Sequence, residues 1–112
     1  LQDAARDTEA LDRVHDLRFA LDALLAGEHG RRIDAARVVA AGHSYGANTA
    51  MLAVGAQVQR DGRTLDLRDA RFGAAMLLSA PPFYGEADPR RVLAPVAVPT
   101  LHVTATEDVI RI

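Results

Sequence analysis

The chain of 112 residues has no cysteine, which excludes a disulfide framework and a zinc site built on thiolates. Aromatic residues are scarce, at 4%. No apolar run approaches the roughly 20 residues that a membrane-spanning helix needs, so no membrane span is predicted. Acidic and basic residues are interleaved along the chain, and the formal net charge is −2. A nucleic-acid-binding surface needs an excess of basic residues, so no nucleic-acid partner is predicted. These absences leave a globular domain that is 49% hydrophobic.

Cofactor-binding patterns are missing as well. No glycine-rich phosphate-binding loop is present, and no pair of histidines has the spacing of metal ligands. We therefore predict no metal and no organic cofactor. The chain begins with Leu1 rather than methionine and ends soon after an apolar strand candidate, so we expect it to be part of a longer polypeptide. It carries no visible targeting signal, and neither compartment nor oligomeric state is predicted.

Helices and strands are expected to alternate along the chain. Leu11, Val14, Leu17 and Leu21 recur at helical spacing, which predicts an amphipathic helix over residues 4–26. Short apolar runs predict strands, and the segments between them predict further helices: strands at 38–41, 74–79 and 100–104, helices at 47–59 and from 89 to about 93. This alternation is typical of an α/β protein with a parallel sheet covered on both faces, a three-layer α/β/α arrangement.

One motif carries chemistry. Gly42-His43-Ser44-Tyr45-Gly46 matches G-x-S-x-G and stands between a predicted strand and a predicted helix. In such a turn the serine backbone is strained and its hydroxyl projects above the sheet, while the two glycines avoid clashes. Ser44 is the candidate nucleophile, and the backbone N–H of Tyr45 is a candidate oxyanion donor. The alternative is an ordinary strand-to-helix turn with a structural serine.

The chain resembles the α/β-hydrolase family over nearly its whole length. Residues 37–47 (RVVAAGHSYGA) look like the family's nucleophile strand and elbow, although Ala47 stands where a second glycine is frequent. Residues 98–108 (VPTLHVTATED) look like a later strand with its acid-bearing loop, with Ala105 in place of the usual glycine. Residues 16–22 are similar to a helix of dienelactone-hydrolase-like and platelet-activating-factor-acetylhydrolase-like members. The resemblance implies that residues 1–112 are the central portion of one α/β-hydrolase domain: nucleophile strand, elbow and two following strands.

The resemblance also implies the acid of a catalytic triad. It makes Asp108 that acid, in the family's chain order of serine, acid and histidine. Other interpretations stay open: Asp108 as a turn residue, or Glu107, Glu86 or Asp88 as the acid. Asp88 is also predicted to cap a helix that begins at Pro89.

The triad histidine has no clear candidate in the chain. His43 and His102 are expected to pack within the fold, His15 lies on the first predicted helix, and no motif surrounds His29. The base and the first oxyanion donor are therefore expected outside this chain.

The sequence favours a serine hydrolase that cleaves small carboxylic esters through an acyl-enzyme on Ser44, and that is not competent as the isolated chain. The alternative is a non-catalytic hydrolase-fold remnant that acts as a binding module. A nucleotide-binding domain shares the alternating pattern but lacks a phosphate-binding fingerprint.

Overall fold

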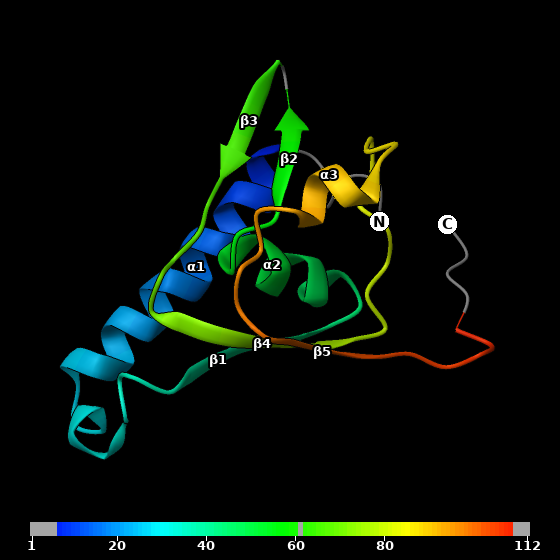
Figure 1. Cartoon of the computed structure of the whole chain (residues 1–112). Helices are drawn as coiled ribbons and strands as arrows, with labels where there is room; N and C mark the ends of the chain where they lie inside the picture. Colours follow the sequence, from blue (N-terminus) through cyan, green and yellow to red (C-terminus); the bar gives the residue numbers. More distant parts are fainter. Residues whose placement is uncertain (1–6, 61, 109–112) are drawn as a thin grey trace.

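The computed structural model describes residues 7–60 and 62–108 of the chain (Figure 1). Its elements follow in this order: α1 (Asp7–Ala26), the 3-10 turn η2 (Gly30–Arg32), β1 (Val38–His43), α2 (Tyr45–Ala53), β2 (Gln57–Arg60), β3 (Arg63–Asp66), β4 (Phe72–Leu78), α3 (Pro89–Leu93) and β5 (Thr100–Val103). The predicted strands correspond to β1, β4 and β5, and the short helix after Asp88 is confirmed as α3.

The central sheet is parallel, with strand order β1-β4-β5. Its register aligns the last residues of the strands: His43 lies opposite Leu78, and Leu78 lies opposite Val103. All three strands therefore end at one edge, on the right in Figure 1. The segments that leave this edge carry the candidate chemistry. The predicted α/β class with a parallel sheet is confirmed.

A small antiparallel hairpin replaces part of the second predicted helix. That helix was expected to reach residue 59, but α2 ends at Ala53, and Gly55 follows with φ +123°. Strands β2 and β3 then pair antiparallel, with Val58 opposite Leu65. The burial of Val58 explains the difference, because an alternating pattern with one apolar face suits a strand better than a helix.

Within residues 7–60 and 62–108 the α-helices lie on one face of the sheet, so the predicted three-layer arrangement is not seen there (Figure 1). On that face Ala40, Ala75 and Leu77 are buried. The opposite face remains open among the described residues, and its side chains, expected to be buried, are exposed: Val39, Met76, Leu78, Leu101 and Val103.

Small side chains bring α2 against the sheet. Ala47, Ala50 and Ala53 are at most 1% exposed, and α2 contacts both β1 and β4. Without bulky groups the helix axis can approach the strands closely, and dispersion contacts accumulate over the whole helix. The position of α2 in turn fixes where its first residue, next to Ser44, meets the sheet edge.

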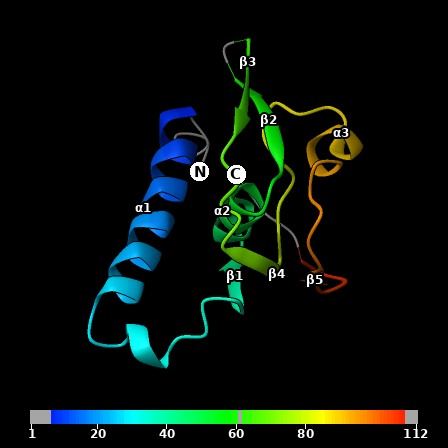
Figure 2. The ribbon, with the colours of Figure 1, turned by 60° about the vertical axis from the view of Figure 1, so that its left-hand side comes forward.

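Helix α1 packs beside α2 rather than on the strands (Figure 2). Val14 and Leu21 of its predicted apolar face are buried, whereas Leu24 is 50% exposed, so the predicted face is only partly correct. No helix within residues 7–60 and 62–108 combines the length and apolarity that crossing a membrane requires.

The buried carboxylate of Asp69 stabilises the turn before β4. Asp69 is 7% exposed, and the Arg71 guanidinium binds it through Nε at 3.0 Å and Nη2 at 2.6 Å. Arg18 of α1 approaches the same carboxylate at 3.5 Å, while the Asp69 backbone N–H donates to Ala53 at 2.8 Å. The hydrogen bond from Arg71 lowers the pKa of Asp69 below its ordinary 3.8, although burial opposes the shift.

We predict that Asp69→Asn destabilises the protein by about 1–3 kcal/mol near pH 7, because it removes the negative charge and replaces one of the two acceptor oxygens that bind Arg71 with an amino group. The stabilisation by ionised Asp69 is fully present above the ordinary pKa and disappears as the pH falls through the lower folded-state pKa. Urea unfolding at pH 7 and at pH 2.5 should show a gap between wild type and variant that closes in acid. The matched Asp22→Asn variant removes a carboxylate that is 62% exposed and should cost roughly 0–1 kcal/mol. Equal losses for both variants would contradict this account.

Candidate functional site at the sheet edge

Three hydroxyl residues form a row just beyond the ends of the parallel strands. Ser44 follows β1, Ser79 follows β4 and Thr104 follows β5. Backbone hydrogen bonds join the row: Ser44 N–H donates to Leu78 at 2.8 Å, and Ser79 N–H donates to Val103 at 2.8 Å. Neighbouring strands lie about 4.8 Å apart, so the row spans roughly 10 Å of the sheet edge. In open α/β sheets this edge is where ligands usually bind.

Ser44 has the strained backbone expected of a nucleophile turn. Its φ is 55° and its ψ is −124°, a conformation that non-glycine residues rarely adopt. It also caps α2, since its carbonyl accepts from the N–H of Ala47 at 2.9 Å. The positive end of the α2 dipole therefore lies beside Ser44, where it favours negative charge. The catalytic role of Ser44 stays a prediction.

The two motif glycines differ in what they do. A Cβ on Gly42 would lie 2.1 Å from the carbonyl oxygen of Gly46 and 2.6 Å from the nitrogen of Ala47, which confirms the need for glycine there. A Cβ on Gly46 would meet nothing nearer than Arg13 Nη2 at 3.9 Å. The predicted steric requirement at Gly46 is therefore wrong.

Tyr45, the predicted oxyanion donor, opens α2 directly after Ser44. The Arg13 guanidinium of α1 lies 4.8 Å from the centre of its ring, and Arg13 Nε donates to Thr49 Oγ1 at 3.0 Å. Burial raises the pKa of the Tyr45 hydroxyl, while Arg13 acts in the opposite direction. These contacts hold α1 against the first turn of α2.

Asp108 lies on the row of hydroxyls. Its Oδ2 accepts from Thr104 Oγ1 at 3.2 Å, and its N–H donates to the carbonyl of Ala105 at 3.1 Å. Hydrogen bonding by the Ser79 hydroxyl is the largest of the influences that lower the pKa of Asp108. The structure thus places the predicted acid in the turn after β5, two strands from the one that ends at Ser44.

The competing acids have other partners or positions. Glu86 accepts from the backbone N–H of Gln59 at 2.6 Å and pairs with Arg60 at 3.2 Å. Asp88 caps α3 by accepting from the N–H of Arg90 at 3.1 Å. Glu107 is exposed in the same turn as Asp108. Among the four candidates, Asp108 has the hydrogen bonds that tie it to the sheet edge.

The structure corrects the expectation for two histidines. His43 and His102 were expected to pack within the fold, yet both are exposed. His43 ends β1 on the open face of the sheet, and its charge contributes to the lowered pKa of Asp108. His102 lies on the face toward α2, with Nε2 at 3.1 Å from Thr100 Oγ1. His15 and His29 are exposed on α1 and in the following turn.

Sequence reasoning missed Ser79 altogether. This residue shares with Ser44 a positive φ, here 53°. Its position as the last residue of a predicted strand was the available signal, because parallel strands end at one edge. Only the register of the sheet, however, shows that it lies between Ser44 and Thr104 at the edge.

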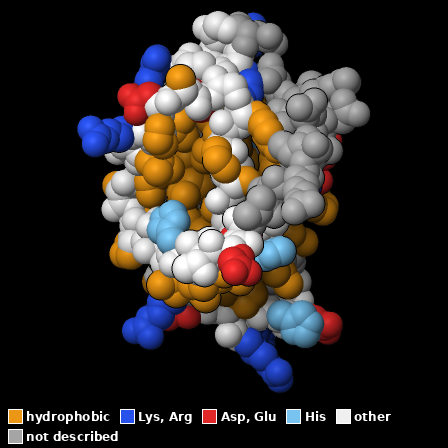
Figure 3. All heavy atoms as spheres, turned by 90° about the vertical axis from the view of Figure 1, so that its right-hand side faces the viewer, with side chains coloured by type: hydrophobic (Ala, Val, Ile, Leu, Met, Phe, Trp, Pro, Cys, Tyr) orange, Lys and Arg blue, Asp and Glu red, His pale blue; other side chains and the backbone are white. Residues whose placement is uncertain are grey.

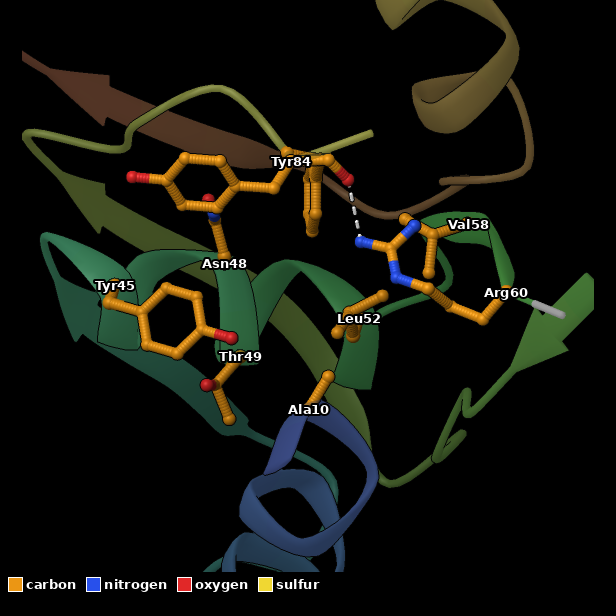
Figure 4. Close-up of a pocket in the computed structure, with 9 residues that line it drawn as sticks. Ala10, Tyr45, Asn48, Thr49, Leu52, Val58, Arg60 and Tyr84 are labelled. Carbon is orange, nitrogen blue, oxygen red and sulfur yellow. Dashed lines mark hydrogen bonds between the residues drawn. The ribbon is translucent and has the colours of Figure 1, made fainter. Parts of the chain in front are cut away.

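Two of the cavities that border α2 share lining residues. The smaller one, about 20 Å³, is lined by Asn48, Tyr45, Thr49, Tyr84 and residues around them (Figure 4). The larger one, about 350 Å³, is open to the surface and lies between α2, α3, β5 and the segment after β4. Hydrophobic side chains surround a hollow on the side of the molecule where the strands end (Figure 3). Asn48 and Phe83 line both cavities.

The comparisons with known proteins found no matching family model, curated protein or solved structure. In the described parts of the chain, no group of three or more acidic or histidine side chains is arranged to hold a metal ion.

We predict opposite outcomes for alanine at the two motif glycines. Gly42→Ala should lower the free energy of unfolding by at least about 3 kcal/mol, because backbone must move to admit the methyl group. Gly46→Ala should leave stability unchanged or raise it by up to about 1 kcal/mol, since alanine suits a helix better. Urea denaturation of both variants checks this, and a well-tolerated Gly42→Ala would contradict the described turn.

Removing the Ser79 hydroxyl should raise the pKa of Asp108 toward 3.8, because the carboxylate loses the hydrogen bond that stabilises its ionised form most. NMR titration of the Asp108 carboxyl carbon in wild type and Ser79→Ala measures the shift. Thr104→Val, which removes the other side-chain hydrogen bond, should raise the same pKa by a smaller amount. An unchanged Asp108 pKa in Ser79→Ala would refute the contact.

Proposed function

We propose that the chain is part of a serine hydrolase of the α/β-hydrolase type that cleaves small carboxylic esters. The observation that carries this proposal is the backbone of Ser44, strained at φ 55° on a turn that admits only glycine at position 42. Strain of this kind concentrates at functional sites, and this turn is the one on which such hydrolases carry their nucleophile. The G-x-S-x-G motif and the parallel sheet add support.

In the proposed reaction, Ser44 Oγ attacks the carbonyl carbon of the ester and forms a tetrahedral intermediate. A histidine takes the serine proton and passes it to the leaving alcohol, which departs as the acyl-enzyme forms. Water, deprotonated by the same histidine, then releases the carboxylic acid. The N–H of Tyr45 and the α2 dipole stabilise the oxyanion.

Asp108 orients this histidine and stabilises its charged form. Its position supports the role: Thr104, after β5, donates a hydrogen bond to it, and the lowered pKa favours its ionised form. The proposal takes the histidine from outside these 112 residues, since His15 and His29 lie on α1 and the turn after it, and His43 and His102 extend from the strands themselves.

A fluorophosphonate probe tests the nucleophile in the whole natural protein. We expect labelling that Ser44→Ala abolishes and that Ser79→Ala retains, at a lower rate. Asp108→Asn should keep substrate affinity but lower kcat for p-nitrophenyl acetate, by on the order of a thousandfold or more, because the histidine loses its orienting partner. Labelling that persists in Ser44→Ala would sink the proposal.

A non-catalytic binding module is the second candidate. The observation that favours it is the open sheet face, where Val39, Leu101 and Val103 are each about half exposed. Exposed apolar patches frequently mark interaction sites. A natural protein that neither reacts with the probe nor hydrolyses esters would make this the better proposal.

A further inference from the structure

Asn48 has a buried side chain that lacks a hydrogen-bond partner. Its side chain is 3% exposed, and its Nδ2 atom donates to no group in the described structure. The large majority of buried side-chain polar atoms in proteins have a hydrogen-bond partner, because an unpaired one loses its hydrogen bonds to water without replacing them. An unpaired amide in this position therefore calls for an explanation beyond folding.

The position of Asn48 relates it to the candidate nucleophile. It follows Ser44 by four residues, which is about one turn, or roughly 6 Å along the axis of α2. Its side chain extends from the helix toward the ring of Tyr84 (Figure 4). Asn48 is among the residues that line both the small cavity and the larger, open one.

The larger cavity has the character of a site for an uncharged, mainly apolar group. Its volume of about 350 Å³ falls within the range of small-molecule sites. Its walls are largely apolar, formed by Met51, Pro81, Phe83, Val92 and Leu93, with His102 at β5. No lysine or arginine is among its described lining residues, and Glu86 is the one carboxylate, so an anionic group is disfavoured.

We infer that this cavity binds the acyl chain of the ester, and that Asn48 donates a hydrogen bond to an uncharged oxygen on that chain. This inference rests on the proposed function. The preferred substrates are then esters of aliphatic acids that carry a ketone or ether oxygen. A site built to pair a polar group discriminates strongly against an analogue without it, because its own buried donor would stay unpaired.

A matched pair of substrates tests this in the whole natural protein: p-nitrophenyl 5-oxohexanoate and p-nitrophenyl 5-methylhexanoate, which differ by a ketone oxygen in place of a methyl group. We expect the wild type to favour the ketone ester in kcat/KM. Asn48→Leu, of similar volume, should lower that preference by about tenfold or more, since each 1.4 kcal/mol corresponds to a factor of ten. The control Gln59→Leu removes an amide that pairs with Thr64 on the exposed hairpin, and should leave the preference unchanged.

Thermal unfolding of the same variants separates binding from structure. Asn48→Leu should unfold at the same or a higher temperature, because it removes an unpaired buried donor. The small cavity has room for one water molecule, which is the competing partner for the amide. A lower unfolding temperature for Asn48→Leu together with an unchanged substrate preference would assign the amide to that water and overturn the inference.

A binding measurement distinguishes failure of this inference from failure of the hydrolase proposal. Asn48 is the only asparagine in the 112 residues, and its side-chain NMR signal in asparagine-labelled protein is assigned by its loss in Asn48→Leu. Adding methyl 5-oxohexanoate to the Ser44→Ala protein should shift this signal. A shift without hydrolysis by the wild type would overturn the hydrolase and keep the site, whereas hydrolysis of both esters with no shift would overturn the site alone.

Discussion

Between β1 and α2 the chain reverses in a space too small for one methyl group. The backbone of residue 42 approaches that of Gly46 and Ala47 so closely that only glycine fits. This contact brings the helix directly over the strand it follows, and the small residues Ala47 and Ala50 continue the close approach along α2. It also forces Ser44 into its strained conformation at the end of the sheet. The position of the candidate nucleophile is therefore a consequence of how the helix reaches the sheet.

The register of the sheet then decides what surrounds Ser44. Because β1, β4 and β5 end in line, the residues after them form the row of Ser44, Ser79 and Thr104. Thr104 donates a hydrogen bond to the carboxylate of Asp108, and the Ser79 hydroxyl lowers the pKa of that carboxylate. An exposed carboxylate is ordinarily mobile and well solvated, so the hydrogen bond from Thr104 and the turn closed through Ala105 give it a defined place. The pairing of the strands thus sets the spacing of the polar groups at the edge of the sheet.

Much of this arrangement could be predicted from local patterns. Apolar runs located β1, β4 and β5, Asp88-Pro89 located α3, and the G-x-S-x-G motif located the turn at Ser44. The β2–β3 hairpin was missed, although Asp61-Gly62 between two alternating segments is a hairpin signal in the sequence. The predicted layering differs from the structure. An all-apolar strand such as β1 predicts helices on both faces of the sheet, whereas the described helices lie on one face. Ser79 and Asn48 could not be recognised, because their surroundings come from register and cavities rather than from neighbours in sequence.

The unfavourable features of the structure gather at one end of the sheet. Ser44 and Ser79 are the non-glycine residues with positive φ in the part of the chain that the structure describes, and each such residue costs roughly 1–3 kcal/mol. Net stabilities of domains are only about 5–15 kcal/mol, so this cost is substantial. Glycine at positions 44 and 79 would adopt the same φ without strain. Stability alone would therefore not favour serine at these two positions. An exposed carboxylate lies beside them, and an unpaired amide lies one helical turn from Ser44. Their presence at the edge where parallel sheets bind ligands supports the proposed hydrolase.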